Sequence, residues 1–125
     1  MPLHWALTYQ TSGSDDRPVG NVYNAAGNID TFCYETSKDV PIRHDGWRGS
    51  LTVGRIPVDA LDQFERILAE IPITRHDPEW NCQNWVWYGL RELRQTGFAI
   101  DPDLNFARLK TQMLELLEAW ENGDI

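Results

Sequence analysis

The chain is poor in cysteine, in basic side chains and in long apolar runs. Only two cysteines occur in 125 residues, and 11 basic side chains stand against 19 acidic ones, which gives a net charge of −8 at pH 7. Such a chain repels a polyanion and carries no Lys/Arg cluster, so we expect no nucleic-acid partner. No apolar run approaches the roughly 20 residues that span a bilayer, so we also expect no membrane anchor.

The low cysteine content bears on the redox environment and on stability. Two cysteines, Cys33 and Cys82, are too few for the disulfide framework of a small secreted domain, and nothing in the sequence supports a disulfide between them. We find no secretory leader before the first expected strand and therefore expect a reduced, cytoplasmic setting. Residues 1–125 are long enough to bury a core as one domain without disulfides.

Strands are expected early in the chain and helices later. Short aromatic or alternating runs predict strands over 4–9, 21–26, 29–36 and 50–56, with an exposed polar loop over 11–18. Apolar residues at helical spacing predict helices over 59–70, 82–94 and 105–122, the last with Leu109, Met113, Leu116, Leu117 and Trp120 facing inward. This order predicts an α+β fold in which an antiparallel sheet of four to five strands packs against about three helices.

Cys82 stands at the predicted start of a helix, after the loop Asp77-Pro78-Glu79. Asn81 is a suitable N-cap, which places Cys82 in the first turn. There the unpaired N–H groups and the helix dipole favour thiolate over thiol, so the position suits a nucleophile. The alternative is that Cys82 is a small buried filler, which an isolated cysteine usually is. A catalytic role therefore depends on a histidine partner from elsewhere in the chain.

Three histidines could serve as that partner. His4 lies on the first expected strand, where a sheet would fix its orientation, and its alternative is a partly exposed residue near a chain terminus. His76 precedes Cys82 in a loop, at a spacing that allows contact without imposing it. His44 lies in an irregular segment and is most simply a surface residue. Asn24, on a neighbouring strand, could orient the imidazole of His4 or could be an ordinary polar residue beside a turn.

Six tryptophans are unusual in a chain of this length, and three of them crowd the Cys82 segment: Trp80, Trp85 and Trp87. They could form the apolar wall of a substrate-binding groove, or they could belong to the core. Tyr9 and Gln83 are candidate donors to an oxyanion, together with the backbone N–H of Cys82. Too few ligand residues cluster at a recognisable spacing for structural zinc, so we expect neither a metal nor a cofactor.

Two short motifs resemble a known superfamily. His4-Trp5-Ala6-Leu7 on a first strand and Asn81-Cys82-Gln83-Asn84-Trp85-Val86 at the start of a later helix resemble the circularly permuted branch of the NlpC-type papain-like proteins. This branch includes the lecithin retinol acyltransferase-like and PPPDE proteins, and uncharacterised fungal members share both motifs. The resemblance spans most of the chain in element order. It implies a papain-like fold with Cys82 as nucleophile, His4 as general base and Asn24 as the third polar residue.

Three departures narrow what the resemblance implies. The acyltransferase-like members usually have His where this chain has Asn24 and Glu-His where it has Gln83-Asn84, and their C-terminal membrane anchor has no counterpart here. Papain-type enzymes use Asn as orienter, so Asn24 is compatible with activity. The resemblance implies a cysteine-dependent hydrolase or acyl or peptidyl transferase that acts on an amide or ester carbonyl of a peptide, acyl or small-molecule substrate. The alternative is a catalytically silent binding module with the same fold. The sequence does not predict an oligomeric state.

Overall fold

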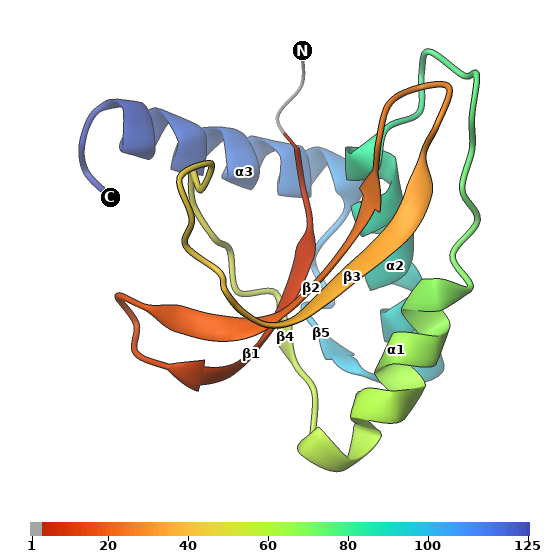
Figure 1. Ribbon diagram of the computed structural model, residues 1–125, viewed down its shortest axis with the longest axis horizontal. Helices are drawn as coiled ribbons and strands as arrows, with labels where there is room; N and C mark the ends of the chain where they lie inside the picture. Colours follow the sequence, from red (N-terminus) through yellow and green to blue (C-terminus); the bar gives the residue numbers. More distant parts are fainter. Residues whose placement is uncertain (1–3) are drawn as a thin grey trace.

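The computed structural model describes residues 4–125, in which a three-stranded antiparallel sheet is followed by helices (Figure 1). The sheet has the order β1-β2-β3, with β1 at Leu7–Gly13, β2 at Pro18–Ala26 and β3 at Cys33–Pro41. A separate pair joins β4 (Gly54–Arg55) to β5 (Ala99–Ile100). The helical segments are η1 (Val58–Ala60), α1 (Leu61–Ala69), α2 (Cys82–Thr96) and α3 (Phe106–Glu121). The α+β class is confirmed, but the main sheet has three strands in the described residues instead of the expected four to five.

The first hairpin is longer than the sequence pattern predicts. The segment 11–18, expected as a loop, extends β1 to Gly13 and begins β2 at Pro18, and these two residues pair. Residues 11–17 are exposed, so their side chains carry no alternation of apolar and polar types by which a strand could be recognised. Residues 4–6 lie outside β1, although a strand was predicted from His4 onward.

Because of the turn after β2, the third strand begins later in the chain than the sequence predicts. Asn28 Oδ1 accepts the N–H of Asp30 at 2.9 Å, and the Asn28 carbonyl accepts the N–H of Thr31 at 2.9 Å. This side-chain-stabilised turn occupies the positions at which a strand was predicted, so β3 begins at Cys33. The strand predicted over 50–56 is mostly irregular, since only Gly54–Arg55 pairs with another strand.

The core lies between one face of the sheet and the helices α1 and α2 (Figure 1). Its largest fully buried side chains are Tyr23 from the sheet, Leu68 from α1, and Trp85 and Leu93 from α2. These layers approach closely at Gly89. A Cβ at this position would lie 3.1 Å from Leu7 Cδ1 and 3.2 Å from Leu68 Cδ2, so a larger residue would require both side chains to shift.

The helix α3 lies away from α1, and the irregular segment 42–53 runs beside it (Figure 1). Asn105 caps α3, since its Oδ1 accepts the N–H of Arg108 at 2.8 Å. The guanidinium of Arg48 lies 3.8 Å from the centroid of the Trp120 ring, which fastens the segment to the helix. Trp120 was expected to face inward but is 37% exposed beneath this cation. Within residues 4–125, the helices are too short or too polar to cross a bilayer.

Candidate functional site

Cys82 is the first residue of α2, as the sequence predicts. Asn81 Oδ1 accepts the N–H of Gln83 at 2.8 Å, and Asn84 Oδ1 accepts the N–H of Asn81 at 2.9 Å. This reciprocal capping box fixes the first turn of the helix and therefore the position of the sulfur. The Cys82 side chain is buried, with 6% of its surface exposed.

The opening segment of the chain reaches this sulfur. The backbone N–H of Trp5 donates a hydrogen bond to Cys82 Sγ at 3.3 Å, across 77 residues of sequence. The buried indole of Trp5 meets the ring of Phe106 edge to face, with centroids 6.4 Å apart. Trp5 therefore connects the start of α2 to the start of α3. Sequence reasoning missed this donor, because a backbone contact over such a distance leaves no pattern in the chain.

Burial raises the pKa of the Cys82 thiol, because the thiolate would lose its hydration. The backbone N–H groups of Trp5, Cys82 and Gln83 lower the pKa and offset part of this effect. The N–H donors expected at a helix start are therefore present. The expectation that they favour the thiolate is nevertheless wrong for the net pKa, because the effect of burial is larger than theirs. The neutral thiol is the resting form at pH 7, and a thiolate forms only if a base removes the proton.

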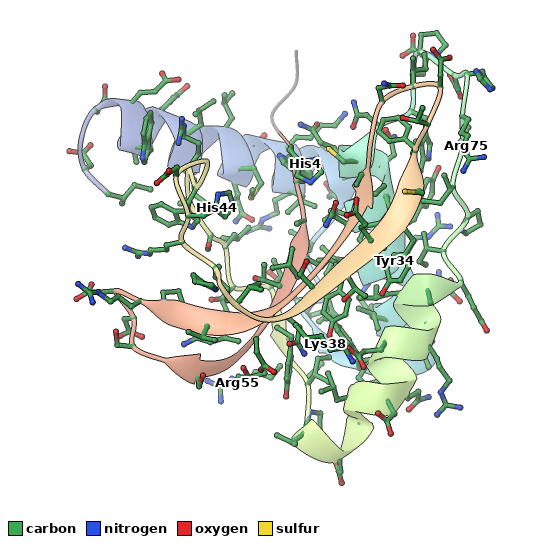
Figure 2. All side chains as sticks on the ribbon, in the orientation of Figure 1. His4, Tyr34, Lys38, His44, Arg55 and Arg75 are labelled. Carbon is green, nitrogen blue, oxygen red and sulfur yellow. The ribbon has the colours of Figure 1, made fainter. Side chains whose placement is uncertain are left out.

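His4 and Asn24 lie on neighbouring segments. The His4 side chain is exposed, and Figure 2 shows it on the side of the sheet where α3 lies. Asn24 is half-buried on β2. The last β1–β2 pair at this end of the hairpin is Leu7 with Tyr23, so Asn24 is the next residue of β2 and lies at the end of the hairpin that residues 4–6 precede. Among the described residues, no hydrogen bond joins the His4 ring to Asn24. The described hydrogen bond to the Cys82 sulfur therefore comes from the backbone N–H of Trp5, the residue after His4, and not from the His4 imidazole.

The other two histidines have partners of their own. His76 Nδ1 lies 2.9 Å from Asp30 Oδ1, and the His76 N–H donates to the carbonyl of Ile29 at 2.7 Å, so this residue is tied to the 28–31 turn. His44 Nδ1 accepts the N–H of Gly46 at 3.0 Å within its own turn. His4 is therefore the histidine that adjoins the segment touching Cys82.

Two of the candidate substrate-binding aromatics belong to the core. Trp85 has no exposed surface and packs on Tyr34 at 5.8 Å between ring centroids. Trp80 is 8% exposed and meets Phe32 edge to face at 5.3 Å. These placements correct the expectation of a groove wall, because neither side chain offers a surface to a ligand. Trp87 is half-buried and stacks on Phe106, with ring centroids 6.2 Å apart.

The two candidate side-chain donors have different outcomes. The Tyr9 hydroxyl donates to the carbonyl of Ile56 at 3.1 Å. Tyr9 also lies four residues beyond Trp5, a distance of roughly 13 Å along an extended chain. The expectation that its hydroxyl donates to an oxyanion at Cys82 is therefore corrected. Gln83 is half-buried in the first turn of α2, adjacent to Cys82, and keeps its place as a candidate.

Neither a metal nor a disulfide is suggested at this site. Within the described part of the chain, no three His, Cys, Asp or Glu side chains are grouped so that they could hold a metal ion. Cys33 is exposed at the start of β3, Cys82 is buried, and the two do not form a disulfide.

A model of a family of unknown function, DUF6540, matches residues 1–99. The chain belongs to the DUF6540 family. The matched region holds both His4 and Cys82, and it ends before α3 begins at Phe106. Neither a curated protein nor a solved structure matches the chain. Membership of DUF6540 therefore gives the chain a family without giving it an activity.

Proposed function

We propose that this DUF6540 protein is a cysteine-dependent hydrolase or acyl or peptidyl transferase with a permuted papain-like fold. The structural observation on which the proposal rests is the 3.3 Å hydrogen bond from the Trp5 N–H to Cys82 Sγ. This bond holds Trp5 against the first residue of α2. His4 is the residue before Trp5, and its Cα is therefore only about 3.8 Å from that of Trp5. The motifs shared with the permuted papain-like proteins support the same assignment.

In the proposed reaction, His4 takes the proton from the Cys82 thiol as the sulfur attacks an amide or ester carbonyl. A base is required because burial raises the pKa of this thiol. The backbone N–H of Cys82 stabilises the oxyanion, and Asn24 orients the imidazole. The C–N or C–O bond then breaks, and the imidazolium protonates the leaving group. Water or a second acceptor attacks the thioester, its proton passes to His4, and the thiol is restored.

The thiol must stay reduced for this chemistry, so we place the activity in the cytoplasm. The substrate is a peptide, an acyl compound or another small molecule with an amide or ester carbonyl. Neither nucleic acid nor a membrane anchor has a part in the reaction.

Acylation by p-nitrophenyl acetate tests the proposal, with the modified residue located by mass spectrometry. We expect an acetyl thioester on Cys82 in the wild type and none in Cys82→Ala. His4→Asn should slow acylation by about 100-fold or more, which is the usual contribution of a general base. His76→Asn and Cys33→Ser are the matched controls and should acylate like the wild type. Acetylation confined to Cys33, or a His4→Asn rate equal to that of the wild type, would overturn the proposal.

A second candidate is a catalytically silent binding module that keeps the fold. The raised pKa of Cys82 favours it, because a thiol that is held neutral is a poor nucleophile. The same experiment separates the two candidates. A silent module would form no thioester with any ester, thioester or peptide, and it would keep its ligand affinity in Cys82→Ala.

A further inference from the structure

A cavity of about 400 Å³ lies between α2, α3 and the irregular segment 42–53. Its walls are mostly aliphatic, and they include Val86 and Leu90 of α2, Met113 and Leu117 of α3, and Leu51. The volume falls in the range of roughly 300–1,000 Å³ that is typical of small-molecule sites. An apolar body of modest size is therefore the part of a ligand that these walls would bind.

The Arg48 guanidinium is the permanent charge among the described residues that line this cavity, and no Asp or Glu lies among them. This is the reverse of the whole chain, in which 19 acidic side chains outnumber 11 basic ones. The cavity therefore favours a ligand with a negative charge over a neutral or positive one.

His44 presents a defined hydrogen-bond donor. Its Nδ1 accepts the N–H of Gly46 at 3.0 Å, so in the neutral ring the proton resides on Nε2. A ring held in one tautomer by its own turn donates without first having to reorganise. Figure 2 shows His44 and His4 on the same side of the sheet as α3, and both line this cavity.

Arg48 is the fixed cation of the cavity. Its Nη1 donates to the carbonyls of Asp45 at 3.1 Å and Trp47 at 2.9 Å, while the guanidinium lies over the Trp120 ring. These contacts hold the side chain in place. The guanidinium also carries N–H donors on Nε and Nη2, which suit a carboxylate.

We propose that this cavity binds a small apolar molecule with a single anionic head group, and specifically an aliphatic carboxylate. The aliphatic walls take the chain, and Arg48 and His44 take the carboxylate. This ligand site goes beyond the proposed thiol chemistry and does not require it, although His4 adjoins both.

Calorimetric titration with decanoate, decan-1-ol and decylammonium tests the charge preference. Decanoate should bind at least about ten-fold more tightly than decan-1-ol, because its carboxylate gains charge-assisted hydrogen bonds. Decylammonium should bind most weakly. Cys82→Ala should bind decanoate like the wild type, so a failure of the thiol chemistry would leave this result unaffected. Equal affinities for decanoate and decan-1-ol would show a merely apolar pocket and would overturn the proposal.

A pair of variants on α3 locates the site. Met113→Glu places a negative charge on the cavity wall and should weaken decanoate binding by about ten-fold or more. Leu114→Glu makes the same change of charge on the adjacent residue, which is 55% exposed and does not line the cavity, and it should bind like the wild type. Thermal melting of both variants checks that they fold. Equal weakening by the two substitutions would place the ligand elsewhere and would refute the site.

Discussion

The hydroxyl of Tyr23 donates a 2.6 Å hydrogen bond to Glu65 Oε2 and so joins the middle strand of the sheet to α1. Lys38 of β3 binds the other carboxylate oxygen at 3.1 Å. Burial raises the pKa of Tyr23, and the Tyr23 hydrogen bond is the largest of the effects that lower the pKa of Glu65. The proton therefore stays on the phenol and the negative charge on the carboxylate, and this network holds α1 against the sheet.

Removal of the Tyr23 hydroxyl is expected to destabilise the protein. Tyr23→Phe should lower the free energy of unfolding by roughly 1.5–3 kcal/mol, the usual value for a hydrogen bond to a charged group. Urea denaturation measures the change. Tyr88→Phe removes a hydroxyl from a tyrosine that is 38% exposed on α2, and its effect should stay within about 0.5 kcal/mol. Equal losses in the two variants would contradict the role of the network.

The same network predicts how stability depends on pH. Because the pKa of Glu65 is lower in the folded protein, its contribution is present above the unfolded pKa of about 4.3 and is lost as the pH falls through the folded value. The raised pKa of Tyr23 acts at the other end, since its contribution is present below about pH 10 and is lost as the pH rises beyond it. Melting temperatures from pH 3 to 7 should fall less steeply in acid for Glu65→Gln than for the wild type. Parallel curves would refute the assignment to Glu65.

Loss of the α2 cap should weaken the helix that begins with Cys82. Asn81→Ala removes the acceptor for the Gln83 N–H and should cost about 1 kcal/mol in the free energy of unfolding. Guanidinium chloride denaturation measures this cost. Asn122→Ala at the exposed end of α3 is the control and should be nearly neutral. A cost for Asn122→Ala as large as that for Asn81→Ala would argue against the cap as the cause.

The raised pKa of Cys82 predicts the order in which the two thiols are alkylated. In the ligand-free protein, iodoacetamide at pH 7 should modify the exposed Cys33 first. The buried Cys82 should be modified more slowly at this pH, because burial raises the pKa of its thiol. Peptide mapping over time measures both rates, and Cys33→Ser isolates the second. Faster alkylation of Cys82 than of Cys33 at pH 6–7 would show a lowered pKa instead.

The helices could be predicted well because their ends carry local signals. Asn81 begins α2 and Gly97 ends it with φ 107°, a left-handed conformation that glycine adopts readily. Asn105 caps α3 at the predicted boundary. The strands were predicted less well, because the outer part of the first hairpin is exposed and the turn over 28–31 is built from short polar side chains.

For the candidate site, the sequence predicts where Cys82 lies in its helix but not how deeply its side chain is buried. Asn81 suffices to place Cys82 in the first turn of a helix. Neither the burial that raises its pKa nor the Trp5 N–H that lowers it, from 77 residues away, leaves a local pattern in the chain. The pairing of Tyr23 with Glu65 is equally remote, across 42 residues.

The family match ends at Ala99, whereas one wall of the aliphatic cavity is α3. Residues 1–99 of this chain therefore do not enclose that space by themselves. Any ligand that fills the space would therefore be held partly by residues that lie outside the matched region.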